Sequence, residues 1–453
     1  QEQQAMKRTI CTAVLLTAAL AARAQQPESP AAAAPEKAEG GRIYRTEVVP
    51  YDTRHDAEAR NREAGGYWKA FEPQTLVAAE GIAVVGGEFD IPYVWSDGDV
   101  FLHIENAGAG YTLRINDRVV ADTEDPATPA EYLISPYIRQ GANSIRILMR
   151  PGCAEELNAD AVQREAFSGS YFYFQNKRAI RDFEIALVPD TLGRDFGMLD
   201  LRIIARNSFN YDEPVTVGYD IYSPQGKLLE FNMREVVIPG RSTDTVRFSP
   251  LIYHTYENKW EAGAKNPPLY KVMLFTRRDG VYKEYMPMKI GFGKTELIDG
   301  RLMRLGKELK LVKASYNAAA DRKTTLAGLK ALKAQGKNTV CPDYPQPAWF
   351  YELCDEVGLY VIDRANIAPS DRRGDRTVGG TPANDPSLAD EFLARVKAMY
   401  YRSRNFTCVV AYELGGAAGN GYNMYKAYEW LKSVEPSRPI LYGDADGEWN
   451  TDL

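Results

Sequence analysis

The chain has 453 residues, of which 45% are hydrophobic and 26% are charged, and its formal net charge is −6 at pH 7. This length predicts two to four domains, and the hydrophobic fraction is sufficient for a substantial core. An acidic chain of this kind is not expected to bind nucleic acid. The 28 Tyr and 6 Trp suit surfaces that stack on sugars, but packing in β-sandwich cores is the more common role of aromatic side chains.

The N-terminal segment has the features of a secretory signal. Met6-Lys7-Arg8 is basic, residues 10–21 are apolar, and Ala22-Arg23-Ala24 fits a cleavage site. The apolar run is too short for a stable bilayer anchor, and no other stretch predicts a membrane span. We therefore expect residues 1–24 to be a signal peptide and the protein to be exported, either periplasmic or secreted. Residues 25–42, rich in Pro, Ala and Glu, predict a disordered linker.

Cysteine and histidine usage does not indicate a metal centre. Export permits disulfides, but Cys341 and Cys408 fall in expected strands and Cys354 in an expected helix, which favours free buried thiols. Cys153 is the remaining cysteine after the signal segment. The histidines are scattered, each is expected to be a surface or packing residue, and no Cys/His spacing fits a zinc site; they are His55, His103 and His254. We expect no metal ion and no cofactor.

Two all-β blocks precede a mixed region. Residues 43–190 contain short strands with period-two alternation, such as Val100–Ile104 and Tyr111–Ile115, separated by polar turns. This pattern is typical of a β-sandwich. Residues 195–297 form a second all-β block of roughly the size that an immunoglobulin-like sandwich requires.

From Leu309 onward, strands and helices alternate. Residues 309–315 predict a strand, and Thr324–Gln335 predicts a helix that stops at Gly336. Another helix is expected to start at Asp385-Pro386. Five strands with intervening helices predict a parallel β/α structure.

The most informative stretch is residues 402–425, RSRNFTCVVAYELGGAAGNGYNMY. The β-branched and aromatic residues of Phe406–Leu414 favour a buried strand. Gly415, Gly416 and Gly419 allow the backbone to turn sharply at the carboxyl end of this strand. In strand–helix repeats, chemistry takes place at that end.

This stretch resembles the fourth barrel strand of glycoside hydrolase family 2, the β-galactosidase and β-glucuronidase family. The match runs without a gap and is carried by Arg402, Asn405, Val409, Leu414, Gly415, Gly419, Gly421 and Asn423. Residues 122–147 and 179–189 resemble the family's sugar-binding domain, and Trp260 with Pro267-x-Leu269-Tyr270 resembles its second domain. The resemblance implies a jelly-roll β-sandwich at 43–190, an immunoglobulin-like β-sandwich at 195–297 and a partial (β/α)8 TIM barrel at 298–453. Because a full barrel takes about 250 residues, we expect a C-terminally truncated member.

The resemblance also implies a degenerate site. The family's Asn-Glu pair, whose Glu is the general acid/base, falls on Gly416 and Ala417. Arg364 stands where the family has another glutamate, and the nucleophile would lie beyond Leu453. A retaining glycosidase needs two carboxyl groups about 5 Å apart, so we expect this chain to be catalytically inactive.

Some polar residues remain as candidates to line the cleft. They are Asn366, which matches the family, and Tyr316, Asp343 and Glu413 at expected strand ends, with Asp444 and Asp446 as further acidic candidates. An ion pair with Arg or Lys is the ordinary role of a strand-end carboxylate such as Glu413. The glycines of the turn also resemble the nucleotide loop of short-chain dehydrogenases, but that loop should open the first βα unit, and here it follows four strands.

Three functions stay open. The first is a family member that no longer hydrolyses glycosides and binds a β-galactoside-like carbohydrate. The second is an active retaining exo-β-glycosidase with a relocated acid. The third is a structural interaction protein of an exported complex, and a homo-oligomer is also compatible with the sequence. Sugar binding without turnover would support the first, turnover the second, and neither the third.

Overall fold

The computed structural model describes residues 41–79, 82–150, 157–158, 165–187, 196–369 and 373–453. The expected signal peptide, most of the expected linker and Cys153 lie outside the described residues. In the described part of the chain, none of the helices has the length and apolarity needed to cross a membrane. Cys341, Cys354 and Cys408 are free thiols, as expected; Cys354 and Cys408 are buried, whereas Cys341 is only half-buried.

The linker prediction is wrong at its last residue. The Arg42 side chain donates to the Asp125 carboxylate at 3.1 Å and to the Thr128 carbonyl at 2.9 Å. The sequence predicts a solvent-exposed side chain for a charged residue next to a Pro/Ala-rich run. It does not reveal the partners of Arg42, because they lie more than eighty positions away.

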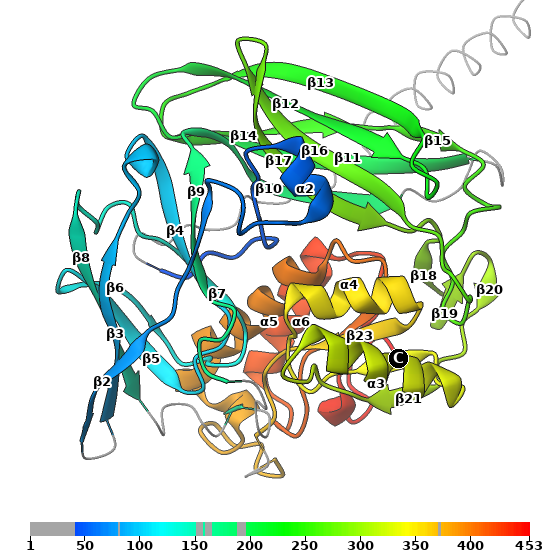
Figure 1. The fold of residues 1–453 in the computed structure, drawn as a ribbon. Helices are drawn as coiled ribbons and strands as arrows, with labels where there is room; N and C mark the ends of the chain where they lie inside the picture. Colours follow the sequence, from blue (N-terminus) through cyan, green and yellow to red (C-terminus); the bar gives the residue numbers. More distant parts are fainter. Residues whose placement is uncertain (1–40, 80–81, 151–156, 159–164, 188–195, 370–372) are drawn as a thin grey trace, which may run out of the picture. The chain divides into compact units, whose positions relative to one another are not determined.

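The first domain is a sandwich of two antiparallel sheets (Figure 1). One sheet has the order β1-β9-β4-β7 and the other the order β2-β3-β8-β5-β6. Leu102 on one sheet and Leu113 and Ile147 on the other share one buried core, as period-two alternation predicts. The elements are β1 (Trp68–Ala70), β2 (Gln74–Ala79), β3 (Ile82–Asp90), η1 (Tyr93–Trp95), β4 (Gly98–Ile104), β5 (Gly110–Ile115), β6 (Arg118–Thr123), β7 (Ala130–Leu133), β8 (Ala142–Arg150) and β9 (Tyr171–Asn176). The helix α2 (Arg54–Ala59) precedes them in the sequence and packs on the second domain through Ala57.

The second domain is another antiparallel sandwich. Its sheets have the orders β10-β11-β14, with β15 also paired to β11, and β13-β12-β16-β17. Leu201 and Ile203 of the first sheet pack against Val217 and Leu274 of the second in one core. The strands are β10 (Arg178–Leu187), β11 (Phe196–Asn207), β12 (Glu213–Tyr222), β13 (Leu228–Ile238), β14 (Ser242–Phe248), β15 (Leu251–Tyr253), β16 (Tyr270–Arg278) and β17 (Val281–Ile290).

Strand β10 corrects the predicted boundary between the two sandwiches. We expected it to close the first domain, which would end at residue 190. Instead it pairs with β11 from Arg178↔Asn207 to Leu187↔Leu199, and Ile180 lies in the second core. The boundary therefore falls between β9 and β10. The alternation of apolar and polar residues along a strand shows which side chains share a face. It does not show which sheet the strand joins.

A small antiparallel sheet links the sandwiches to the last region. It consists of β18 (Thr295–Ile298), β19 (Arg301–Arg304) and β20 (Lys307–Glu308). The predicted boundary between 297 and 298 therefore falls inside β18. The strand expected at 309–315 is shorter, since only Lys313–Ser315 forms β21.

The last region contains a parallel sheet of order β21-β22-β23-β24-β25 with helices packed against it (Figure 1). Leu329, Val361 and Val410 are fully buried in the core that these elements share. The remaining elements are α3 (Arg322–Ala334), β22 (Thr339–Cys341), α4 (Ala348–Val357), β23 (Tyr360–Arg364), η3 (Pro382–Asn384), η4 (Pro386–Leu388), α5 (Ala389–Ser403), β24 (Val409–Glu413), α6 (Tyr422–Val434), β25 (Ile440–Leu441) and η5 (Gly443–Ala445).

The predicted helix starts hold to within a few residues. Asp321 caps α3, where its side chain accepts the Thr324 backbone N–H at 2.8 Å. At the other predicted start, Asp385 accepts the Ser387 N–H at 2.9 Å and opens the short turn η4. The α-helix α5 follows at Ala389, four residues later than expected.

Candidate functional site

Parallel strands bring the expected cleft residues to one edge of the sheet. Arg364 ends β23 and Glu413 ends β24, and the two residues are paired in the sheet register. The Nε and Nη2 atoms of Arg364 each donate to one Glu413 oxygen at 2.9 Å. Its Nη1 atom lies 3.8 Å from Asp343, which follows β22. Glu413 therefore has the ion-pair role that is ordinary for a strand-end carboxylate.

This arrangement keeps a fixed positive charge at the strand ends. Burial alone lowers the pKa of Arg364, but the hydrogen bonds and charge of Glu413, with the charge of Asp343, more than compensate. The pKa of Arg364 is therefore raised above its ordinary value. Its bidentate geometry is the strong form of a guanidinium–carboxylate contact.

The turn after β24 has the backbone that its glycines require. Gly415 has φ +137°, and a Cβ there would lie 2.5 Å from the Ile367 carbonyl oxygen, so no other residue fits without a shift. A Cβ added at Gly416 would instead make ordinary van der Waals contacts, because its nearest neighbours, at 3.8 Å, are guanidinium atoms of Arg364. Ala417 follows in the left-handed region with φ +56°. The position expected for the acid/base therefore carries a methyl group.

Asn366 makes contacts that point toward the first sandwich. Its side chain is fully buried, and Nδ2 donates to Asp125 Oδ1 at 2.8 Å and to Asn158 Oδ1 at 3.0 Å. Asp125 comes from the loop between β6 and β7. In this structure the residue joins two domains and does not line an open cleft.

Of the other candidates, Tyr316, Asp343 and Asp444 are partly exposed and have local partners. The Tyr316 hydroxyl donates to the Thr325 carbonyl at 3.3 Å, and Asp343 accepts from Asn317 at 2.8 Å. Asp444 accepts the Gly419 backbone N–H at 3.0 Å, whereas Asp446 is exposed. Only Asp343 and Glu413 therefore share one ionic cluster, through Arg364.

Several residues of the 402–425 stretch connect the domains. Arg404 donates to Asp182 on β10 at 2.8 Å. Asn405 donates to the Thr46 hydroxyl at 2.8 Å and accepts the Ile185 backbone N–H at 2.9 Å. The sequence analysis missed this role, because the partners are separated from these residues by more than two hundred positions.

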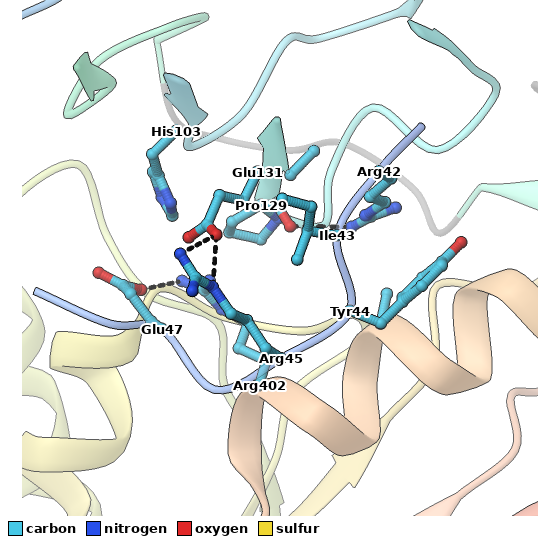
Figure 2. A pocket seen from close by; sticks show the side chains of 11 residues that line it. Arg42, Ile43, Tyr44, Arg45, Glu47, His103, Pro129, Glu131 and Arg402 are labelled. Carbon is cyan, nitrogen blue, oxygen red and sulfur yellow. Dashed lines mark hydrogen bonds and ion pairs between the residues drawn. The ribbon is translucent and has the colours of Figure 1, made fainter. Parts of the chain in front are cut away.

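A second ionic cluster surrounds Arg402 (Figure 2). Its Nη2 atom lies 3.1 Å from Glu47 and 3.5 Å from Glu105, and Glu105 contacts His103 Nε2 at 2.8 Å. The cavity here has a volume of only about 20 Å³, which suits a single water molecule.

Three side chains of this second cluster resemble a metal-ligand set. Ligand atoms of Glu47, His103 and Glu105 lie within 4.8 Å of one another. However, the guanidinium of Arg402 already supplies the positive charge that faces both carboxylates. His103 is also stacked on Tyr171 with ring centroids 4.6 Å apart, so it has the packing role expected from the sequence.

A larger cavity of about 420 Å³ runs along α4. This volume lies in the range of small-molecule sites. Its walls come from the segment before β1, from β17 and from the starts of α3 and α4, and Trp349, Tyr51 and Phe406 contribute aromatic rings. An ion pair between Lys289 and Glu356 at 2.9 Å connects β17 to α4.

Comparisons with known proteins agree with this architecture. Residues 316–452 match the family model described as "Glycosyl hydrolases family 2, TIM barrel domain". The β-galactosidase of Erwinia tasmaniensis is 27% identical over 375 residues, covering 77% of this chain and 35% of that protein. The β-galactosidase of Vibrio cholerae is 28% identical over 422 residues, covering 88% of this chain and 38% of that protein.

Solved structures show the same fold. A glycosyl hydrolase family 2 member from Bacteroides cellulosilyticus superposes with TM-score 0.69 at 16% identity, covering 82% of this chain and 50% of that chain. The Bacteroides uniformis β-glucuronidase superposes with TM-score 0.68 at 14% identity, covering 88% of this chain and 52% of that chain.

These matches assign the α/β region to the TIM-barrel class. Residues 316–452 are similar to the TIM-barrel domain of glycoside hydrolase family 2, and the chain is similar over most of its length to β-galactosidases. It spans about a third of the length of the curated relatives it matches.

Proposed function

We propose that this chain is a β-galactosidase-like protein of carbohydrate metabolism that binds a β-linked glycoside and does not hydrolyse it by the family's usual route. One observation carries the proposal. At the end of β24 the acid/base position is the methyl group of Ala417, and the charged group beside this turn is the Arg364 guanidinium, bound to Glu413. The names of the curated relatives support a β-galactoside as the ligand class.

The chemistry of the strand ends explains the expected lack of turnover. A retaining glycosidase must give a proton to the departing glycosidic oxygen. Arg364 cannot supply it, because a guanidinium keeps its protons at any physiological pH. Glu413 accepts two N–H bonds from that guanidinium and offers no proton in this geometry. The same charged groups are well suited to hydrogen bonds with sugar hydroxyls.

The remaining expectations of the sequence belong to the same proposal. The first sandwich corresponds to the family's sugar-binding jelly roll and the second to its immunoglobulin-like domain. The protein acts outside the cytoplasm, in the periplasm or after secretion, as the basic and apolar segment at its N-terminus indicates.

The test uses the complete protein and measures binding and turnover separately. Calorimetry with β-galactosides should show binding, and unactivated disaccharides should show no turnover above background. Nitrophenyl β-galactosides need little acid assistance, so slow release of nitrophenol is compatible with the proposal. Turnover of an unactivated β-galactoside at ordinary enzyme rates, roughly 1–10³ s⁻¹, would establish a relocated acid and overturn it.

Two variants make the test specific to the acid position. Gly416→Asn with Ala417→Glu restores both family residues, whereas Gly416→Asn alone restores only the hydrogen-bonding amide and serves as the matched control. A gain in turnover for the double variant alone would show that the missing acid limits the reaction. If no sugar binds to any form, the third function, a structural partner without a sugar ligand, replaces the proposal.

A further inference from the structure

Strand β13 is a long edge strand with an apolar outer face. It lies at one end of the order β13-β12-β16-β17, and among the described residues only β12 pairs with it (Figure 1). The side chains of Phe231, Met233 and Val237 point to one face and are 67%, 46% and 67% exposed. An exposed edge of this kind is a template for pairing with another strand.

The usual protections of an edge are weak here. The register with β12 is regular from Glu230 to Ile238, and the one irregularity lies next to Tyr222, near the start of β13. The strand contains no proline and no lysine, and the charged side chains that could protect its edge are Glu230, Arg234 and Glu235. The unpaired edge of β13 is therefore long enough to form backbone hydrogen bonds with another strand.

Neighbouring strands extend the apolar face. A Cβ added at Gly218 would lie 2.5 Å from the Phe275 ring and 2.7 Å from Met233 Cβ, so these two side chains meet over the glycine. Phe275 in turn contacts Tyr282 edge-on, with ring centroids 5.0 Å apart. Phe275 is buried beneath this face, and Tyr282 is 42% exposed beyond it.

The sequence of β13 is complementary to itself. In an antiparallel pair across a two-fold axis at Asn232, Phe231 faces the partner's Met233 on the outer face. Glu230 then faces the partner's Arg234 on the other face, and the same contact occurs again by symmetry. A shift by two residues puts Phe231 opposite the partner's Glu235, or Arg234 opposite the partner's Leu228, and loses both ion pairs.

We propose that β13 pairs with β13 of a second copy of this chain, which joins the two sheets β13-β12-β16-β17 into one continuous sheet. Both charged side chains belong to this edge strand, and each also has a contact within its own sandwich. Glu230 accepts from the Tyr219 hydroxyl at 3.4 Å, and the Arg234 guanidinium lies over the Phe248 ring at 5.1 Å. Opposite charges placed directly across strands stabilise the pair, and like charges destabilise it.

The experiment measures the oligomeric state of the complete protein by sedimentation velocity over a concentration series. The wild type should be a dimer. Glu230→Arg places two like charges opposite each other at two places in the interface, and so does Arg234→Glu. Each variant should weaken the dimer by about tenfold or more.

Rescue separates this interface from a folding defect. An equimolar mixture of the two single variants should form a heterodimer, because each Arg at 230 then meets a Glu at 234 and the native pair forms beside it. The double variant should also dimerise. Asp244→Arg, at an exposed position of strand β14 in the same sandwich, is the matched control and should leave the dimer unchanged.

Three results would overturn the proposal. They are a monomeric wild type at all concentrations, single variants that associate as the wild type does, and a mixture of the single variants that remains monomeric although each variant is folded by circular dichroism. An assembly that forms through another face would give the second result.

Discussion

Arg404 and Asp182 form an ion pair at 2.8 Å in which the two side chains are only 3% and 0% exposed. The pair connects the turn before β24 to strand β10 of the second sandwich. Asp182 also accepts the backbone N–H groups of Thr46 and Phe183. Burial lowers the pKa of Arg404, but the charge of Asp182 more than compensates, so this pKa is raised.

Arg404→Ala should destabilise the protein strongly, because it leaves the Asp182 carboxylate buried without its partner. The expected loss of unfolding free energy is roughly 3–5 kcal/mol, measured by chemical denaturation. Arg278→Ala is the control, since its pair with Asp279 is exposed and should contribute below about 1 kcal/mol. Equal losses of unfolding free energy for the two variants would contradict a larger contribution from the buried pair.

Asp355 should make stability depend on pH. Burial raises its pKa to about 7, although the Cys408 N–H bond at 2.7 Å opposes the shift. The folded state therefore binds more protons than the unfolded state between about pH 4 and 7. The contribution of Asp355 to stability is then most favourable at low pH and is lost as the pH rises through this window.

Asp355→Asn should remove this dependence. Relative to the wild type, the variant should gain at least about 2 kcal/mol of unfolding free energy between pH 4 and 7, since each pKa unit corresponds to about 1.4 kcal/mol. Denaturant titrations across that range are the measurement. Asp244→Asn, at an exposed site, should follow the wild-type curve, and parallel curves for all three proteins would rule out the effect.

Ala417→Gly should stabilise the protein. Ala417 has φ +56°, and a left-handed backbone costs a residue with a Cβ about 1–2 kcal/mol. Glycine lowers this cost but loses more chain entropy, so the net gain should be about 1 kcal/mol in thermal or chemical denaturation. The neighbouring Ala418 is fully buried and has no positive φ, so Ala418→Gly should destabilise. A loss in both variants would argue against strain at Ala417.

Asn366→Ala should lower stability without changing sugar affinity. The Asn366 amide donates to Asp125 and Asn158, and buried acceptors left without donors cost about 1–3 kcal/mol. Calorimetry should give carbohydrate affinities for variant and wild type within about twofold. Asn258→Ala is the control, because the bond that Asn258 donates to the His254 carbonyl is exposed. A large loss of carbohydrate affinity in Asn366→Ala would indicate that this residue contacts the sugar, as the sequence predicted.

Much of the fold was predictable from local pattern. Alternation identified both sandwiches, and Leu329, on the predicted apolar face of α3, is fully buried. The predicted strand at Phe406–Leu414 contains β24. These inferences succeed because a strand or helix must bury one face whatever its neighbours are. The partner sheet of β10 was not predictable, because both sandwiches offer an apolar face.

For the candidate site too, some features were predictable from the sequence and others only from the structure. The sequence by itself predicted, from its resemblance to the family, that Ala417 falls on the acid/base position and that Arg364 stands where the family has a glutamate. Only the tertiary structure decided that Arg364 binds Glu413, that Asn366 contacts the first sandwich and that Arg404 contacts the second. The reason is physical: covalent order sets which groups a strand end can carry, whereas the partner of a charge is set by long-range packing that brings distant segments together.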